Sequence, residues 1–198
     1  MNKKHFLLPV LAIALVVIAV SCQTSASNSN SNDSNSTLDL ILKSYSARTF
    51  TSESVSTADI EVILKCGIKA PSAANLQPWK FIVVREHSVM QQMIRNITEN
   101  NVVILVCGPE AQANFSVDFD CGLSTENMTI AAQSLGLGAR IYTGPIANIN
   151  STMKETLQIP EGYRGVAALR IGHIEKDVDA ASVASPRNNY EDVVTFLK

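Results

Sequence analysis

The chain has 198 residues, a formal net charge of −2 at pH 7 and a hydrophobic fraction of 46%. A net charge this close to zero argues against nucleic acid as a partner, because binding to a phosphate backbone draws on an excess of Lys and Arg. Residues 38–198 have the length of one domain with a sizeable core, and they contain no internal repeat.

Residues 1–22 have the pattern of a signal for export from the cytoplasm. Lys3 and Lys4 precede an apolar run over residues 6–20, and small residues lead directly to Cys22. As a helix this run would be about 22 Å long, short of the roughly 30 Å hydrocarbon core of a bilayer, so a membrane span is the weaker interpretation. We interpret 1–22 as a lipoprotein signal peptide that ends at Cys22, the expected site of lipidation.

A lipid on Cys22 would anchor the chain to a membrane, facing the periplasm or the cell exterior of a bacterium. Ordinary signal cleavage at the same place is the alternative, and both interpretations put the mature chain outside the cytoplasm. Residues 23–37 are rich in Ser and Asn and contain no large apolar side chain, so they are predicted to be a flexible linker. The folded domain is expected to span residues 38–198.

Two amphipathic helices are predicted at the start of this domain. The first carries apolar residues at helical spacing, namely Leu38, Ile41, Leu42 and Tyr45. The second follows Ser56, has Asp59 in its first turn as helix starts commonly do, and carries Ile60, Ile63, Leu64 and Ile68.

A strand, a helix and a second strand are predicted to follow. Apolar runs rich in β-branched residues occupy 81–84 and 102–106. Between them, one helical face is formed by Met90, Met93, Ile94 and Ile97. The alternation of strand and helix thus begins in the first half of the domain.

The second half is predicted to hold a long helix, two strands and a short helix. In chain order, their expected ranges are 119–135 (helix), 139–143 (strand), 151–157 (short helix) and 166–171 (strand). Four strands alternating with helices predict a mixed α/β or α+β sheet, whose strand order the sequence does not give. The segment 186–198 has too many large apolar residues for a free tail and could reach a partner chain; they are Tyr190, Val193, Val194 and Phe196.

Three cysteines remain once Cys22 is set aside: Cys66, Cys107 and Cys121. They form no C-x-x-C motif and have no neighbouring His, so each is expected to pack as a small hydrophobic residue. One disulfide plus a free thiol stays open as an alternative in an oxidising compartment.

Two segments carry residue types from which a ligand site could be built. Residues 44–50 (SYSARTF) place hydroxyls and an Arg directly after a helix, which suits phosphate oxygens, although a polar turn is the plain alternative. Residues 70–79 (APSAANLQPW) are neither helical nor charged. Their small side chains let the backbone approach a flat ligand, and Asn75 and Gln77 can donate and accept hydrogen bonds. A rigid loop that only packs Trp79 is the alternative.

A third segment, residues 136–145 (GLGARIYTGP), has glycines around a strand and its exit loop, which alone is a weak indication. Together, the three segments resemble the nitroreductase family, with an R-x-S-x-R-x-F-like start, an A-P-S-x-x-N-x-Q-P-W loop and A-x-x-L-G-L-G. The loop motif is the most specific, because it fixes six residue types over ten positions. The resemblance spans essentially the whole domain. It implies an α+β nitroreductase-like fold, with a central mixed, mostly antiparallel sheet flanked by helices, and a homodimer that binds FMN at the subunit interface.

The resemblance also implies which residues contact the cofactor. Those at its phosphate and ribityl end would be Ser44, Tyr45, Ser46 and, from the C-terminal segment, Arg187. Arg48 would face the pyrimidine edge of the flavin. Those that line the isoalloxazine from the other subunit would be Pro71, Ser72, Ala73 and Asn75. Those that cover it near N5 would be Tyr142, Thr143 and Gly144.

This sequence departs from the family pattern in two ways. Ser44 stands where the family usually has Arg, and Ser185 where it often has Lys, which leaves the retention of FMN open. The connections near Asn100 and before Asp120 are minimal, which predicts a shallow, open site for varied flat acceptors. Asp118 and Asp120 are interpreted as favourable charges at a helix N-terminus rather than as metal ligands.

The implied function is an FMN-dependent oxidoreductase that reduces nitroaromatic, quinone or similar flat acceptors, with NAD(P)H as the family's usual donor. No catalytic side chain is expected, because the chain offers no Ser/His/Asp or paired-carboxylate arrangement and the flavin would carry the chemistry. NAD(P)H belongs to the cytoplasm, in conflict with the export signal. The alternative is an exported lipoprotein that binds a flavin or another ligand without turnover.

Overall fold

The computed structural model describes residues 31–111, 115–175, 178–179 and 186–197, so Cys22, most of the predicted linker and Ser185 lie outside the described ranges. In its first half the elements are α1 (Ser31–Leu42), α2 (Thr57–Ile68), the 3-10 turn η1 (Ala73–Asn75), β1 (Lys80–Val84), α3 (His87–Met93) and β2 (Val102–Pro109). In its second half they are α4 (Val117–Ser134), β3 (Gly138–Tyr142), α5 (Ile146–Thr152), β4 (Tyr163–Gly172) and α7 (Tyr190–Val193).

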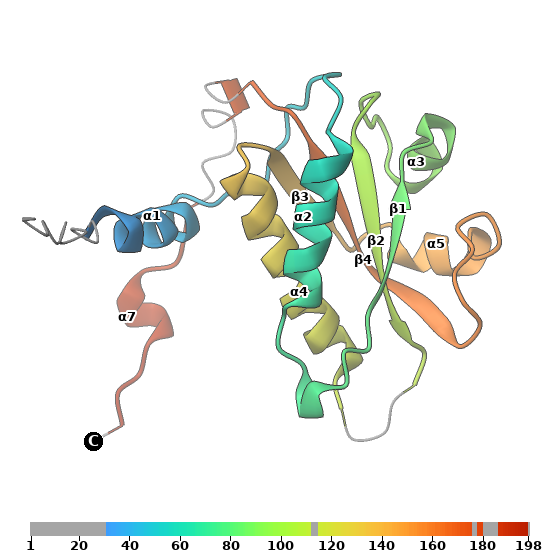
Figure 1. Ribbon diagram of the computed structural model, residues 1–198. Helices are drawn as coiled ribbons and strands as arrows, with labels where there is room; N and C mark the ends of the chain where they lie inside the picture. Colours follow the sequence, from blue (N-terminus) through green and yellow to red (C-terminus); the bar gives the residue numbers. More distant parts are fainter. Residues whose placement is uncertain (1–30, 112–114, 176–177, 180–185, 198) are drawn as a thin grey trace, which may run out of the picture.

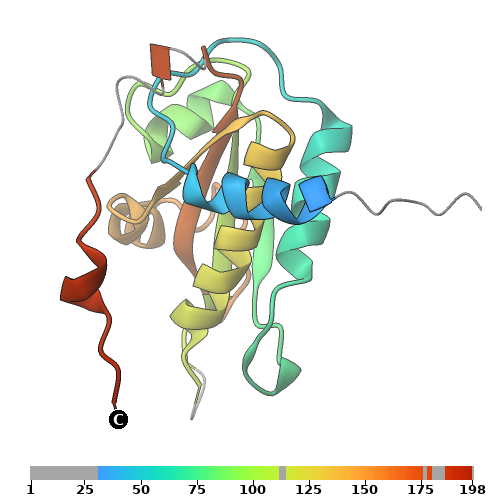
Figure 2. The same ribbon diagram turned by 90° about the vertical axis from the view of Figure 1, so that its left-hand side faces the viewer.

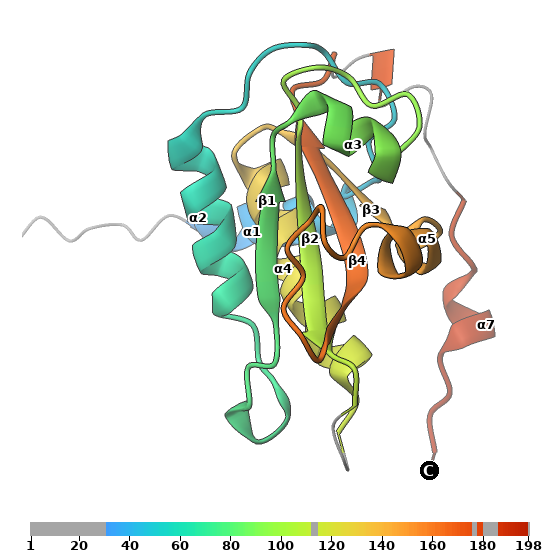
Figure 3. The same cartoon turned by 90° about the vertical axis from the view of Figure 1, so that its right-hand side faces the viewer.

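The strands form one sheet in the order β1-β2-β4-β3, and every neighbouring pair is antiparallel. α2 and α4 cover one face and α3 and α5 the other (Figures 1 and 3). The expected α+β class is confirmed, but the described sheet is antiparallel rather than mixed. α3 and α5 have only seven residues each, about 10 Å, so neither carries the chain back along a strand as a parallel crossover does.

Strand β2 is buried on both faces, which explains its continuous apolar sequence. Ile104 and Val106 belong to the core beneath α2 and α4, whereas Val103 and Leu105 belong to the core beneath α3 and α5. Successive side chains of a strand point to opposite faces, so alternate residues of one apolar run fill two separate cores.

The small and hydroxylated residues of α4 allow it to pack closely on α2. A Cβ added at Gly67 of α2 would lie 2.7 Å from Cγ of Met128, so a larger residue there would push the helices apart. The buried Ser124 hydroxyl donates to the Gly67 carbonyl at 2.9 Å, and Thr125 donates to the Cys121 carbonyl at 2.7 Å. These polar groups are therefore satisfied within the core.

The two short helices differ from their predicted ranges. α3 ends at Met93 because Ile94 is extended and Asn96 has a left-handed φ of 57°, although Ile94 remains buried. α5 begins at Ile146, not at residue 151, because Pro145 supplies a preset φ at its start. Residues 154–158 form turns instead.

The two ends of the described chain also differ from expectation. α1 begins at Ser31, so it takes in residues that composition assigned to the linker; Ser, Asn and Asp are favoured at helix starts. The four apolar residues of the C-terminal segment are not buried in this single chain, and α7 lies apart from the sheet (Figures 1 to 3). Within the described residues, no helix has the length and apolar character needed to cross a membrane.

Candidate functional site

Residues 44–50 run from the end of α1 onto the edge of the sheet. The Ala47 N–H donates to the Ala139 carbonyl of β3 at 3.0 Å, and Phe50 forms a bridge with Ile174. A Cβ at Gly138 would lie 2.9 Å from the Ala47 Cβ and 2.4 Å from Ile174, so this close approach requires glycine. Gly138 of the third motif thus allows residues 44–50, the first motif, to pack against β3.

A buried carboxylate holds the same segment from the C-terminal side of the chain. The Asp179 carboxylate accepts the Arg48 N–H at 2.8 Å and the Thr49 N–H at 2.5 Å. Gln133, near the end of α4, donates to the Tyr45 carbonyl at 2.9 Å. Partial burial, and then the charge and hydrogen bond of Asp179, raise the pKa of the Tyr45 phenol. Asp179 was not predicted, because no pattern in the sequence connects it with a segment 131 residues earlier.

Ala47 and Phe50 are buried, whereas the polar side chains of this segment remain at least partly exposed. Ser46 and Arg48 are exposed, and Ser44 and Tyr45 are half-buried. Beneath α1 and beside Tyr45 lies a cavity of about 560 Å³, which Gln133 and Leu137 also line. α1 itself crosses α4 near the C-terminal end of α4 (Figure 2).

The 70–79 loop is held by buried residues at its ends and is strained in the middle. Ala70 and Trp79 are both buried. Between them, three residues that are not glycine have left-handed φ values: Ala74 (49°), Asn75 (56°) and Gln77 (48°). Such conformations persist only where surrounding contacts fix them, and they cluster at functional sites.

Hydrogen bonds fix this loop from within and from α4. Ser72 Oγ accepts the Gln77 N–H at 2.9 Å, and the Ser72 carbonyl accepts the Asn75 N–H at 3.0 Å. The carboxylate of Asp120, which is 3% exposed, accepts the Ala73 N–H at 3.2 and 3.3 Å. Pro71 and Asn75 are exposed, and Ser72 and Ala73 are half-buried.

These two segments contact opposite ends of α4. Asp120 in its first turn holds the loop, and Gln133 in its last turn holds the 44–50 segment. Thirteen residues of helix separate the two contacts, which at 1.5 Å per residue is about 20 Å. One chain therefore does not bring the two predicted parts of the site together.

The third predicted part lies where β3, an edge strand, leads into α5. Tyr142 is half-buried, and the Arg140 guanidinium lies 4.9 Å from the centre of its ring. Thr143 and Gly144 are exposed, and a Cβ at Gly144 would meet no atom within 4 Å. A flat ligand thus has open space beside this turn.

A buried arginine supports the same region from the neighbouring strand. Arg170 of β4 pairs across the ladder with Arg140 and stacks on Phe50 at 3.9 Å. It donates to Asn101 at 2.8 Å and to Thr98 at 2.9 Å. Burial lowers the pKa of Arg170, which the neighbouring Tyr142 phenol opposes. Neither Arg140 nor Arg170 was selected from the sequence, because both lie within runs typical of ordinary strands.

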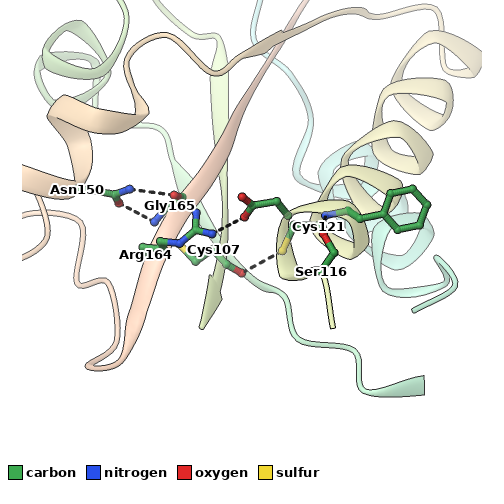
Figure 4. A network of polar contacts seen from close by, with 8 residues as sticks. Cys107, Ser116, Cys121, Asn150, Arg164 and Gly165 are labelled. Carbon is green, nitrogen blue, oxygen red and sulfur yellow. Dashed lines mark hydrogen bonds and ion pairs between the residues drawn. The ribbon is translucent and has the colours of Figure 1, made fainter. Parts of the chain in front are cut away.

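An aromatic pocket of about 480 Å³ adjoins the 70–79 loop at the start of α4. Pro71, Ser72 and Asp120 line it together with two phenylalanines, Phe115 and Phe119, and Phe119 is 64% exposed. In Figure 4 the Ser116 hydroxyl caps α4 by accepting the Phe119 N–H at 3.3 Å. Neither aromatic residue was selected from the sequence.

The two acidic residues of the first turn of α4 have different partners. Asp118 forms an ion pair with Arg164 at 2.5 Å, whereas Asp120 binds the loop. No group of three or more His, Cys, Asp or Glu in the described ranges is arranged to hold a metal ion.

The three cysteines of the domain are free thiols, so the alternative of a disulfide among them is wrong. Cys107 of β2 belongs to the core beneath α3 and α5. Cys121 belongs to the core beneath α4, on the other face of the sheet. The Cys121 thiol donates to the Cys107 carbonyl at 3.8 Å (Figure 4). The last predicted site residue, Arg187, is exposed and lies three positions before the start of α7.

Comparison with known proteins places these features in context. A family described as the nitroreductase family matches residues 41–105 and 91–173. An NADH dehydrogenase/NAD(P)H nitroreductase of Archaeoglobus fulgidus is 32% identical over 153 residues, 72% of this chain and 87% of the relative. An FMN reductase (NADPH) of Bacillus subtilis is 27% identical over 163 residues, 69% of this chain and 65% of the relative.

A solved structure has the same fold. The nitroreductase of Desulfovibrio desulfuricans in complex with FMN superposes with a TM-score of 0.71 at 27% identity. The match covers 82% of this chain and 96% of that one.

Proposed function

Because the chain belongs to the nitroreductase family, we propose that it is an FMN-dependent oxidoreductase that reduces flat acceptors such as nitroaromatics or quinones. The observation that carries the proposal is the placement of two polar, cofactor-type segments at opposite ends of α4 in a chain of this family. The match to the family confirms the resemblance inferred from the three motifs, at the level of the family.

The donor groups of residues 44–48 fit a phosphorylated cofactor. The N–H groups of Ala47 and Arg48 are already taken by Ala139 and Asp179, so ligand contacts at these positions fall to side chains. The hydroxyls of Ser44 and Ser46 and the Arg48 guanidinium then provide the contacts. Guanidinium groups suit phosphate oxygens, and they also suit planar acceptors.

The separation along α4 supports a site shared between two chains. Residues 44–48 and 71–75 of one chain are anchored to α4 at points about 20 Å apart, a separation that favours contacts to one flavin from two chains. A second copy related by a two-fold axis would place its 71–75 loop opposite the 44–48 segment of the first. We therefore propose a homodimer with two sites at its interface.

Bound FMN supplies the hydride and electron transfer. The chain's own residues would bind the cofactor and orient its ring. Arg48 would place a positive charge beside the pyrimidine edge, where it favours added negative charge on the cofactor. The open turn at Thr143 and Gly144 would let the ring lie against backbone, with Tyr142 beneath it.

The aromatic pocket supports flat molecules as acceptors. Phe115 and Phe119 border the loop proposed to cover the flavin, and exposed aromatic rings stack on planar partners. The connection between Pro109 of β2 and Val117 of α4 is short in sequence, which supports acceptors of different sizes.

We also propose that the chain is exported and tethered by a lipid on Cys22, which rests on the sequence of residues 1–22. NAD(P)H is the donor in the names of the relatives, but an exported chain would need a membrane quinol or a reduced carrier protein. Mass spectrometry of the mature N-terminus tests this part separately: an unmodified Met1 or Cys22 would contradict the lipid tether.

The direct test is flavin binding and turnover by the purified full chain. We expect a flavin spectrum, or its appearance when FMN is added, and bleaching under anaerobic NADH or a quinol analogue. Ser44, in place of the family's usual Arg, supports the second candidate, a binder without turnover. Flavin that binds but is reduced by neither donor would favour that candidate, and no binding would contradict both.

Two substitutions test the site assignment. Arg187→Ala and Asn75→Ala each remove a proposed polar contact at an exposed position, so the hydrophobic cores should be unchanged. Each should weaken FMN binding by about tenfold, the effect of one charge-assisted or well-placed hydrogen bond. Asp192→Ala, an exposed residue of α7, is the matched control. Unchanged flavin affinity in both variants would contradict the assignment.

A further inference from the structure

We propose that Asp120 is a positioning residue that fixes the 71–75 loop in the shape in which it covers the flavin of the partner chain. The inference rests on the proposed function, and it assigns to Asp120 a role beyond favouring a helix N-terminus. It concerns the anchoring of the loop to α4.

Burial and geometry point to this role. Asp120 is 3% exposed, and both of its carboxylate oxygens lie 3.2–3.3 Å from the Ala73 nitrogen. Asp118, two residues earlier on the same turn, is exposed and pairs with Arg164 instead. A favourable charge at the helix start needs neither burial nor a loop contact, so the electrostatic explanation covers Asp118 but not the contact of Asp120 with Ala73.

The loop needs such a contact because its own conformation is strained. Left-handed φ angles at Ala74, Asn75 and Gln77 are unfavourable for residues with a Cβ. Hydrogen bonds from Asn75 and Gln77 to Ser72 hold the loop to itself, but they do not attach it to the domain. Asp120 makes that attachment at Ala73, directly before the first strained residue.

This role also explains how the N-terminal end of α4 in one chain would influence a cofactor site near the C-terminal end of α4 in the partner chain. Loop residues fixed by Asp120 are the ones proposed to reach the partner's cofactor, which is bound mainly by residues held near Gln133. Loss of the carboxylate should therefore loosen the loop without disturbing the 44–48 segment of the same chain.

Hydrogen exchange of the full chain without cofactor is the first test. Asp120→Ala should raise the exchange rates of the 72–77 amides by about tenfold or more, and leave those of 44–50 unchanged. Asp118→Ala, the matched control, should change neither. Equal exchange in the two variants would overturn the inference.

FMN titration is the second test. Asp120→Ala should weaken binding by about tenfold, and Asp120→Asn, which keeps one acceptor oxygen, should restore most of it. If the alanine variant fails to fold, Asp120→Leu fills the buried space without an acceptor and should show the same loss. Wild-type FMN affinity in the folded Ala or Leu variant would overturn the inference. If the parent chain binds no FMN while the exchange result holds, the proposed function fails and the anchoring of the loop by Asp120 stands.

Discussion

The 44–50 segment and the 70–79 loop are built in the same way from different backbone. Each follows a helix, each has an aspartate carboxylate on its N–H groups, and each ends at a buried aromatic ring, Phe50 or Trp79. The first segment lies along the sheet edge, whereas the second turns through three left-handed residues. The first segment is therefore ordered by the sheet, whereas the second depends on a few specific contacts.

The largest effect is expected from the aromatic ends. Trp79→Ala should lower the free energy of unfolding by about 3 to 5 kcal/mol, because it leaves a large cavity in a core, and Phe50→Ala should cost about as much. Urea denaturation measures both. Phe119→Ala, at an exposed position, should change stability by less than about 0.5 kcal/mol. A cost below about 1 kcal/mol for either core variant would contradict the idea that both segments end in anchors.

The carboxylate of the first segment should matter next. Asp179→Ala removes the acceptor of two backbone N–H groups, which should cost about 3 kcal/mol and weaken FMN binding. Asp192→Ala, at an exposed site, should be nearly neutral. If Asp179→Ala were as stable as the control, the sheet edge alone would order this segment. The two regions would then not both depend on an aspartate carboxylate.

The sequence identified both regions but not what holds them. Residue types and spacing in 44–50 and 70–79 pointed to a ligand site. The elements on either side of the loop, α2 and β1, were predicted close to their ranges, whereas α1 begins at Ser31 and ends before Tyr45. Gly138 was found as part of a motif, although its reason is the close approach of Ala47. Asp179 and Arg170 could not be predicted, because their contacts join residues far apart in the chain. α5 was misplaced because its start depends on Pro145 rather than on apolar spacing.

Glycine substitutions should have a smaller effect on stability, of opposite sign in the 70–79 loop and the 44–50 segment. Ala74→Gly removes the penalty of a left-handed φ and should raise stability by up to about 1 kcal/mol. Ala47→Gly, in the extended segment, should lower stability by about 1 kcal/mol, because it adds freedom to the unfolded chain without relieving strain. Thermal unfolding of the two variants compares them. Equal signs would mean that the loop is not strained.

The smallest effect concerns the pH dependence of the first segment. Burial and Asp179 raise the pKa of Tyr45 above its ordinary value of 10.0, so the folded chain holds this proton more tightly than the unfolded chain. The resulting stability is fully present below pH 10 and is lost as the pH rises above it. Cys107, with a pKa raised to about 11, adds a similar loss from pH 9 upward. Tyr45→Phe should therefore flatten only part of the decline between pH 9 and 11. A decline identical to that of the parent chain would show that neither burial nor Asp179 raises the pKa of Tyr45.

The most direct test of a site shared between two chains is a mixed dimer. Arg48→Ala damages the first region and Asn75→Ala the second, so neither variant alone should bind FMN tightly. Dimers that contain one chain of each, isolated with two different affinity tags, should regain one intact site per dimer. Flavin absorbance that recovers to about half of the parent stoichiometry is the predicted result. Mixed dimers that bind no more FMN than either variant, or a chain that stays monomeric, would contradict the account.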